Sequence, residues 1–119
     1  MPVGLVIVSH SGDVARGVAA LAAQMAPSVA LAPAGGTDDG DIGTSFDLIA
    51  AAIAQADTGD GAAVLYDLGS ALLTAETAIE FLDPDAAERV RIVDAPLVEG
   101  AIAAAVEAEG GGDLDAVCA

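Results

Sequence analysis

Val3-Gly4-Leu5-Val6-Ile7-Val8-Ser9-His10-Ser11-Gly12-Asp13 is the stretch that decides the fold. The run Val3–Val8 has no polar residue, which is typical of a strand buried on both faces of a parallel sheet. In an open α/β sheet, ligands bind outside the carboxyl ends of the strands. A helix start there favours anions, and imidazole is largely neutral and nucleophilic near neutral pH. His10, the only histidine of the chain, is therefore a candidate nucleophile or phosphoryl acceptor.

The same change from an apolar run to helical spacing recurs along the chain. We expect strands over 3–8, 28–33, 62–66 and 89–93, and helices over 12–26, 44–56, 71–82 and 94–109. Short connections between them predict right-handed crossovers and parallel strands. The expected fold is one α/β domain over residues 1–119: a doubly wound, mainly parallel sheet of about four strands with helices on both faces.

Local patterns refine these elements. The first helix is expected to bury Val14, Val18, Leu21 and Met25, which recur at helical spacing, with Ala22 widening this face. Thr44 or Ser45 is expected to cap the second helix. Pro84 is expected in a short acidic connection, and the glycines 110–112 are expected to end the last helix and release a short tail.

The composition limits the kind of core. Hydrophobic residues make up 55% of the 119 residues, but aromatic residues only 3%. The length is typical of one domain. The core must therefore consist of Ala, Val, Leu and Ile, which suits helices packed on a parallel sheet.

The charge is strongly negative. Nineteen Asp and Glu stand against three Arg and no Lys, for a net charge of -16. Nucleic acid and acidic membrane surfaces are excluded as partners, because binding them depends on Lys and Arg. We hypothesise that the chain works in concentrated salt, which screens such self-repulsion. The alternative is an acidic cytosolic protein rich in Ala, Gly and Asp.

The single cysteine and the N-terminal residues indicate the cellular compartment. Cys118 is the only cysteine, so no intramolecular disulfide is possible. The apolar run at the N-terminus lacks a basic flank and is too short for export or membrane spanning. We expect a cytoplasmic protein. No cofactor and no metal site are expected, because Asp38, Asp39 and Asp41 lack the glutamate that closes a calcium loop.

Three loops follow the first three expected strands: Ser9–Gly12, Gly35–Thr37 and Asp67–Ser70. If the first and third strands are neighbours, Asp67 faces His10. A carboxylate there would accept one ring N–H and leave the other nitrogen free to attack. The glycines would let backbone N–H groups approach an anion, and the hydroxyls of Thr37 and Ser70 would add donors.

Each of these residues also has a structural interpretation. His10 could be a hydrogen-bonded structural residue, Asp67 a helix cap, and the Gly35-Gly36 pair a turn. A Ser-His-Asp hydrolase is disfavoured. Ser70 lacks the G-x-S-x-G elbow, and Ser9 is expected to point to the sheet face opposite His10.

Four motifs together resemble a known family: Gly4–Ser11, Ala34–Thr37 with Ile42–Ser45, Val64–Ala71, and Ala95–Ala101. They are similar to the phosphotransferase subunits of PTS-dependent dihydroxyacetone kinases, which resemble mannose-type enzyme IIA domains of the sugar phosphotransferase system. The resemblance runs over nearly the whole chain.

The resemblance implies a homodimeric phosphotransferase. His10 would accept a phosphoryl group from phospho-HPr and pass it to ADP on the nucleotide-binding subunit of the kinase. The ATP so formed would phosphorylate dihydroxyacetone on a third subunit. The chain is expected to need separate donor proteins, because it is too short for the extra domains of some relatives. Asp67 would hold the imidazole, and the expected phosphate-binding residues are Ser11, Gly12, Thr37, Gly69 and Ser70.

Other functions are left open. A mannose-type sugar IIA component would use the same phosphohistidine, although those proteins usually have a doubled Gly and Ser-Pro where this chain has Asp67–Ala71. A non-catalytic sensor of phosphorylation state would also keep the fold. A chelatase-like protein is disfavoured, because no second histidine is present. Partners of so acidic a surface would need either basic patches or apolar contacts.

Overall fold

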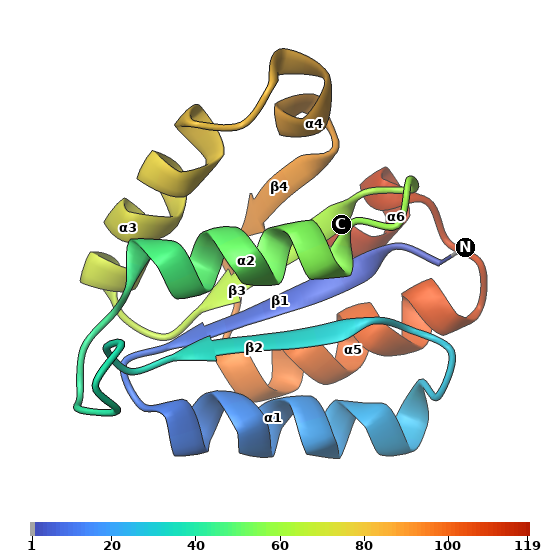
Figure 1. Ribbon diagram of the computed structural model, residues 1–119. Coiled ribbons are helices and arrows are strands. Elements are labelled where there is room, and N and C mark those ends of the chain that lie inside the picture. Colours follow the sequence, from blue (N-terminus) through green and yellow to red (C-terminus); the bar gives the residue numbers. More distant parts are fainter. Residues whose placement is uncertain (1) are drawn as a thin grey trace.

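Four parallel strands in the order β2-β1-β3-β4 form one sheet in the computed structural model, which describes residues 2–119 (Figure 1). The strands are β1 (Gly4–Ser9), β2 (Leu31–Gly35), β3 (Ala62–Tyr66) and β4 (Val90–Val93). In the register, Val6 lies between Ala32 of β2 and Val64 of β3. The expected parallel sheet of about four strands is confirmed.

Helices cover both faces of this sheet. They are α1 (Gly12–Met25), α2 (Phe46–Ala56), α3 (Gly69–Glu80), α4 (Pro84–Glu88), α5 (Leu97–Glu109) and α6 (Leu114–Cys118). Figure 1 shows α1 and α5 side by side below the sheet, and α2 and α3 on the other face. This is the doubly wound arrangement that the alternation of strands and helices predicts. Within residues 2–119, none of the helices has the length and apolarity needed to cross a membrane.

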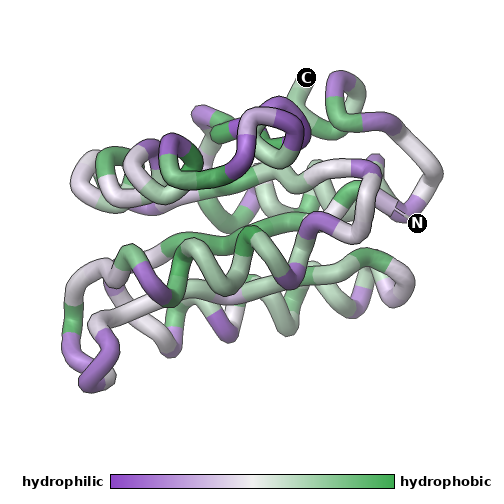
Figure 2. Tube along the Cα trace, turned by 45° about the horizontal axis from the view of Figure 1, so that its top comes forward, coloured by the Kyte–Doolittle hydropathy of each residue, from purple (hydrophilic) through white to green (hydrophobic). Residues whose placement is uncertain are grey.

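The alternation of side chains along β1 builds two cores. Leu5 and Ile7 pack against α1 and α5, whereas Val6 and Val8 pack against α2 and α3. All four side chains are fully buried. Alanines supply much of the opposing helix faces, so the layers lie close together, and the aromatic residues Phe46 and Tyr66 are only partly buried against one of the two cores. In Figure 2 the middle of the sheet is largely green, the colour of hydrophobic residues, whereas the connecting loops are mainly white and purple.

The buried face of α1 differs from the prediction. The helix buries Ala15, Val18, Ala19 and Ala22. Of the expected face, Val18 and Ala22 are buried, whereas Val14, Leu21 and Met25 are 45%, 49% and 56% exposed. The reason is that α1 packs against both β2 and α5, where small side chains permit a close approach. The helical spacing was predicted correctly, but the face of α1 that is buried is the one rich in alanine and not the one with the larger side chains.

The second strand begins later than expected. Residues 28–30 are not part of β2, because they turn out of α1 instead. Val29 N donates to the carbonyl of Ala26 at 3.2 Å, and Ser28 N donates to the carboxylate of Glu109 at 2.7 Å. These contacts use the backbone groups that a strand would need, and pairing starts only at Leu31 opposite Leu5.

Two short helices replace expected irregular segments, and the third long helix starts early. Pro84 opens α4, a position that suits proline because the first turn needs no N–H. The tail folds into α6, whose start is capped by Asp113 accepting from Ala116 N at 2.9 Å. Helix α3 begins at Gly69 rather than Ala71. As expected, Ser45 caps α2, accepting from Leu48 N at 3.2 Å.

Candidate functional site

The carboxyl ends of β1, β2 and β3 meet at one edge of the sheet, on the left in Figure 1. Val8 of β1 pairs with Tyr66 of β3. The next residue after each pair is Ser9 on one strand and Asp67 on the other. The register therefore brings the two loops that contain His10 and Asp67 side by side, at the switch point between strands that lead to opposite faces.

His10 and Asp67 are in direct contact. The imidazole Nδ1 lies 3.0 Å from Asp67 Oδ1, and the side chains are 18% and 23% exposed. An ionised carboxylate can only accept, so Nδ1 carries the proton and Nε2 keeps its lone pair. The hydroxyl of Ser70 donates to Nε2. The ring is therefore fixed at one nitrogen and presents the other near the surface.

Four donors hold the carboxylate of Asp67. Oδ1 also accepts from Leu68 N at 2.8 Å. Oδ2 accepts from Ser9 Oγ at 2.8 Å and from His10 N at 3.1 Å. Burial acts to raise the pKa of Asp67, but the hydrogen bonds from His10, Ser9 and Leu68 outweigh it and hold that pKa below its ordinary value. The carboxylate is thus ionised at neutral pH and fixed in orientation.

Ser9 is a site residue that sequence reasoning missed. Its side chain was expected to point to the face opposite His10, and this expectation is wrong, because both side chains contact Asp67. His10 follows the end of β1, where strand alternation no longer applies. A signal was available in the sequence: a serine ending an otherwise apolar strand needs a hydrogen-bond partner once it is buried.

Two of the predicted phosphate-binding residues, Ser11 and Gly12, lie at the start of α1. Ser11 N donates to Ser9 Oγ at 3.1 Å, and Ser11 Oγ caps α1 by accepting from Val14 N at 3.3 Å. Gly12 lies against Gly35, where an added Cβ at position 35 would approach the carbonyl oxygen of Ser11 to 2.5 Å. Both Ser11 and Gly12 line a small cavity of about 120 Å³, which Arg16 also borders.

At the start of α3, Gly69 and Ser70 are better placed for an anion. The helix has no side-chain cap, so the N–H groups of its first turn have no partner supplied by a capping side chain. Ser70 is joined to Nε2 of His10. A phosphoryl group on that nitrogen would therefore meet both a hydroxyl and the positive end of a helix.

The loop after β2 reaches the site through its backbone. Gly43 N donates to the carbonyl of His10 at 2.8 Å, and Gly36 N to that of Ser9 at 3.3 Å. Gly36 has a positive φ of 75°, which favours glycine. Thr37, a predicted phosphate-binding residue, accepts at its hydroxyl from Asp41 N at 3.2 Å. The structure thus shows Thr37 closing its own turn.

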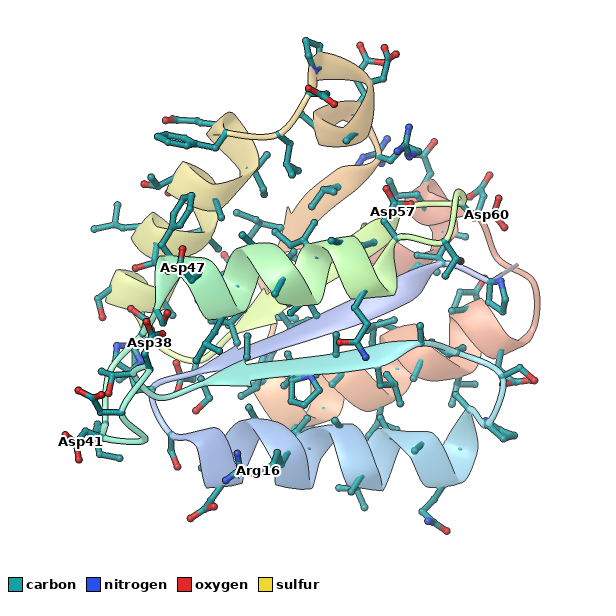
Figure 3. The ribbon with its side chains drawn as sticks, viewed as in Figure 1. Arg16, Asp38, Asp41, Asp47, Asp57 and Asp60 are labelled. Atoms are coloured by element: carbon teal, nitrogen blue, oxygen red, sulfur yellow. The ribbon has the colours of Figure 1, made fainter. Side chains whose placement is uncertain are left out.

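The acidic residues of this loop lie at its tip. Figure 3 labels Asp38 and Asp41 there, and the hydroxyl of Ser45 donates to Asp38. Arg16 projects from α1 and pairs with Asp13 at 2.7 Å. Within residues 2–119, no three His, Cys, Asp or Glu side chains gather closely enough to hold a metal ion.

Two kinds of chemistry fit this arrangement. A neutral imidazole with a free Nε2 can attack an electrophile such as phosphorus. The same contacts also place Ser70, His10 and Asp67 in the order of a Ser-His-Asp triad, which is recognised by geometry rather than by motif.

Residues 4–118 match the family model described as PTS system fructose IIA component. A PEP-dependent dihydroxyacetone kinase phosphoryl donor subunit, DhaM, from Pantoea ananatis is 52% identical over 97% of this chain, and the chain spans 25% of that relative's length. A subunit of the same name from Listeria innocua is 43% identical, with 89% of this chain and 82% of the relative covered.

A solved structure shows the same fold. The crystal structure of EF1359, a protein of unknown function, superposes with a TM-score of 0.89 at 35% identity, covering 99% of this chain and 91% of that one.

Proposed function

This chain belongs to the family of PTS system fructose IIA components, and from that membership we propose that it is a phosphohistidine carrier. His10 accepts a phosphoryl group from phospho-HPr and passes it to ADP bound on the nucleotide subunit of a dihydroxyacetone kinase. The observation that carries the proposal is the imidazole itself. Its Nδ1 is hydrogen-bonded to Asp67, while Nε2 lies at the N-terminus of α3, which has no side-chain cap.

The proposed reaction is an in-line displacement at phosphorus. The Nε2 lone pair attacks the phosphoryl group, the Nε2–P bond forms, and the bond to the donor's nitrogen breaks. The proton stays on Nδ1, where Asp67 stabilises the positive charge that develops on the ring. Ser70 releases Nε2 and donates its hydroxyl to a phosphoryl oxygen. N–H groups of Gly69 and Ser70 meet the other oxygens, so positioning and charge stabilisation supply the catalysis.

The second transfer runs the same steps toward ADP. A β-phosphate oxygen of ADP attacks phosphorus, the Nε2–P bond breaks, and the lone pair returns to Nε2. Few fixed cations near the site are an advantage here, because a carrier that stabilised its phosphohistidine strongly would transfer it slowly. The phosphate-binding roles of Ser11, Gly12 and Thr37 stay predictions, with Ser11 N and the Thr37 hydroxyl already hydrogen-bonded within the chain.

The acceptor and the assembly are part of the proposal. Relatives named as subunits of dihydroxyacetone kinases support that acceptor over a sugar transporter. A homodimer is also part of the proposal: of the two edge strands, β2 contains Pro33, whereas β4 has no proline and is the edge at which a second copy can pair. A cytoplasmic location follows for a carrier that must share a compartment with its donor and acceptor.

Partner docking is proposed to use apolar contacts beside the reactive nitrogen. Leu68 and Leu73 flank Ser70 and are 59% and 66% exposed. A kinase subunit that brings ADP to Nε2 has to cover them, and a cationic rim on that subunit would match the acidic surroundings. We expect Leu73→Ser to weaken binding of the subunit about tenfold, because a tenfold change corresponds to about 1.4 kcal/mol and full burial of a leucine is worth about 1.5–3 kcal/mol.

Leu21→Ser is the matched control for that variant, because Leu21 is similarly exposed on α1, away from Ser70. Discharge of phosphorylated protein by ADP-loaded kinase subunit is measured over a range of subunit concentrations. Equal behaviour of the two variants would rule out docking over Leu73.

The main experiment follows the phosphoryl group. The protein is incubated with enzyme I, HPr and labelled phosphoenolpyruvate, and the ADP-loaded kinase subunit is then added. We expect acid-labile label on the wild type, none on His10→Ala, and discharge to ADP. Label that leaves only to a sugar permease would favour the sugar component, and no label on the wild type would favour a sensor domain.

A second candidate is a hydrolase, favoured by the contact between Ser70 and Nε2 alone. Ser70→Ala separates the two functions. A carrier keeps accepting label at a reduced rate, because His10 is the nucleophile. A hydrolase loses all turnover of an activated ester, since its nucleophile has gone.

A further inference from the structure

The hydroxyl of Ser9 lies between the proposed catalytic pair and the start of α1. Its side chain is 1% exposed, the one polar side chain among residues 2–119 to be counted in the buried core. Oγ donates to Asp67 Oδ2 at 2.8 Å and accepts from Ser11 N at 3.1 Å. One buried hydroxyl therefore joins the carboxylate to the helix that follows the reactive histidine.

We propose that Ser9 is a positioning residue, whose hydroxyl orients the carboxylate of Asp67 and, through it, the imidazole of His10. This inference rests on the proposed function, because the orientation matters only if Nε2 is the reacting atom. The hydrogen bonds of the Ser9 hydroxyl are to Asp67 Oδ2 and Ser11 N, not to the reacting nitrogen.

The two oxygens of Asp67 have different hydrogen-bond partners. A carboxylate can turn about its bond to Cβ, and Nδ1 is served only while Oδ1 faces it. Ser9 is the only side-chain donor to Oδ2 among the described residues; the other donor there is His10 N at the longer distance of 3.1 Å. Because Ser9 is buried, its hydrogen bond lies in a low-dielectric setting and is stronger than an exposed one.

Loss of that donor has a defined consequence at the ring. When the carboxylate turns, Oδ1 no longer favours a proton on Nδ1, and the tautomer protonated at Nε2 gains population. That tautomer has no lone pair at the reactive nitrogen, so it cannot attack phosphorus. The carboxylate also loses a hydrogen bond to its charged form, which makes it easier to protonate.

A merely structural role makes a different prediction. Ser11 N needs only an acceptor, and a hydroxyl that served it alone would leave the imidazole unchanged when removed. Stability would fall, but the tautomer and the titration of Asp67 would not move. Measurements on the ring and on the carboxylate therefore distinguish the two roles.

The chain suits this measurement, because His10 is its only histidine. Protein labelled with ¹⁵N-histidine gives one imidazole, whose two nitrogen shifts report the tautomer, and the ¹³C shift of the Asp67 carboxyl reports its titration. We expect the Nδ1-protonated form to dominate in the wild type. In Ser9→Ala we expect a clear Nε2-protonated fraction and an upward move of the Asp67 midpoint by about one pH unit.

Controls tie the effect to the hydroxyl. Ser9→Thr keeps the hydroxyl and is expected to restore both signals. Ser45→Ala removes another hydroxyl that caps backbone N–H groups and is expected to change neither. If Ser9→Ala melts below the measuring temperature, Ser9→Cys keeps the volume with a weaker donor and provides the same comparison.

Phosphoryl transfer is measured on the same samples. We expect Ser9→Ala to accept label more slowly by up to about 100-fold, the scale of a small misplacement of a catalytic group. Unchanged tautomer and midpoint in folded Ser9→Ala would overturn the positioning role. Failure of the proposed function would appear differently, as a wild type that takes no label, and it would leave the spectroscopic comparison readable.

Discussion

At the scale of single residues, the site is an imidazole whose two nitrogens have different partners. Asp67 accepts a hydrogen bond from Nδ1, and Ser70 donates one to Nε2. The structure thus distinguishes the nitrogen that is held by the carboxylate from the nitrogen that is presented near the surface. The low pKa of Asp67, maintained against burial by its hydrogen bonds, keeps this difference at neutral pH. The presented nitrogen is therefore the one that we expect to be phosphorylated.

Asp67→Ala is expected to slow phosphoryl acceptance about 100-fold or more, the usual scale for a positioned acid-base partner, while the fold is retained. The reason is that Nδ1 loses its acceptor and the tautomer is no longer fixed. Rapid-quench labelling measures the rate, and circular dichroism checks the fold. A rate equal to that of the wild type would remove the role assigned to Asp67.

The nearness of His10 and Asp67 could be inferred from the sequence, because polar residues that follow adjacent parallel strands meet at one edge. The contact of Ser9 could not, since it depends on where β1 stops alternating. Thr37 is a second residue whose local contacts could not be inferred from the sequence. A hydroxyl in a glycine-rich loop suggested phosphate binding, but the loop turns on itself and the hydroxyl accepts from Asp41 N.

At the scale of elements, the residues at which a helix or strand lies were easier to predict than the face of a helix that is buried. The third strand falls at the residues expected, 62–66, because Asp57–Gly61 sets a clear turn before it. The first helix was placed correctly, but only Val18 and Ala22 of its predicted face are buried, since alanines can line a close helix contact as well as larger residues do. The last turn of the chain was missed because a five-residue helix has too little periodicity to detect.

The turn before β3 depends on Asp57, which lies at the opposite edge of the sheet from Asp38 (Figure 3). Oδ1 accepts from Gly59 N and Gly61 N at 3.0 and 3.2 Å, and Oδ2 accepts from Arg89 Nε at 3.0 Å. Burial acts to raise the pKa of Asp57, but these bonds lower it overall. Asp57→Ala is expected to lower the free energy of unfolding by about 1–3 kcal/mol at neutral pH.

The pH dependence of that difference follows from the sign of the shift. The pKa of Asp57 in the folded protein lies below the ordinary carboxyl value of 3.8, so the contribution is complete above that ordinary value and is lost as the pH falls through the folded pKa. Urea unfolding of both proteins at several pH values measures it, with the exposed Asp39→Ala as control. A difference that stayed constant down to about pH 2 would contradict the assignment.

At the scale of the whole molecule, charge dominates. The net charge is -16, and each of the three arginines already pairs with an aspartate: Arg16 with Asp13, Arg89 with Asp57, and Arg91 with Asp115. The remaining carboxylates repel one another across the surface. Overall fold class followed from the sequence because the strand and helix alternation is unbroken, whereas the distribution of charge needed the coordinates.

The melting temperature is expected to rise by several degrees between dilute buffer and about 1 M KCl, where the screening length falls to roughly 3 Å. Differential scanning calorimetry across a KCl series measures it, with sucrose at equal osmolality as the uncharged control. A melting temperature that falls as KCl rises would refute adaptation to concentrated salt.

The close approach of Gly35 to Ser11 has a genetic consequence. Because a methyl group at position 35 would collide with the backbone that leads out of His10, even an alanine there has to push the beginning of α1 away from the sheet. A mutational scan for loss of the proposed phosphoryl transfer should therefore mark position 35 as intolerant. Its glycine has no functional group of its own, and what it contributes is the room that it leaves.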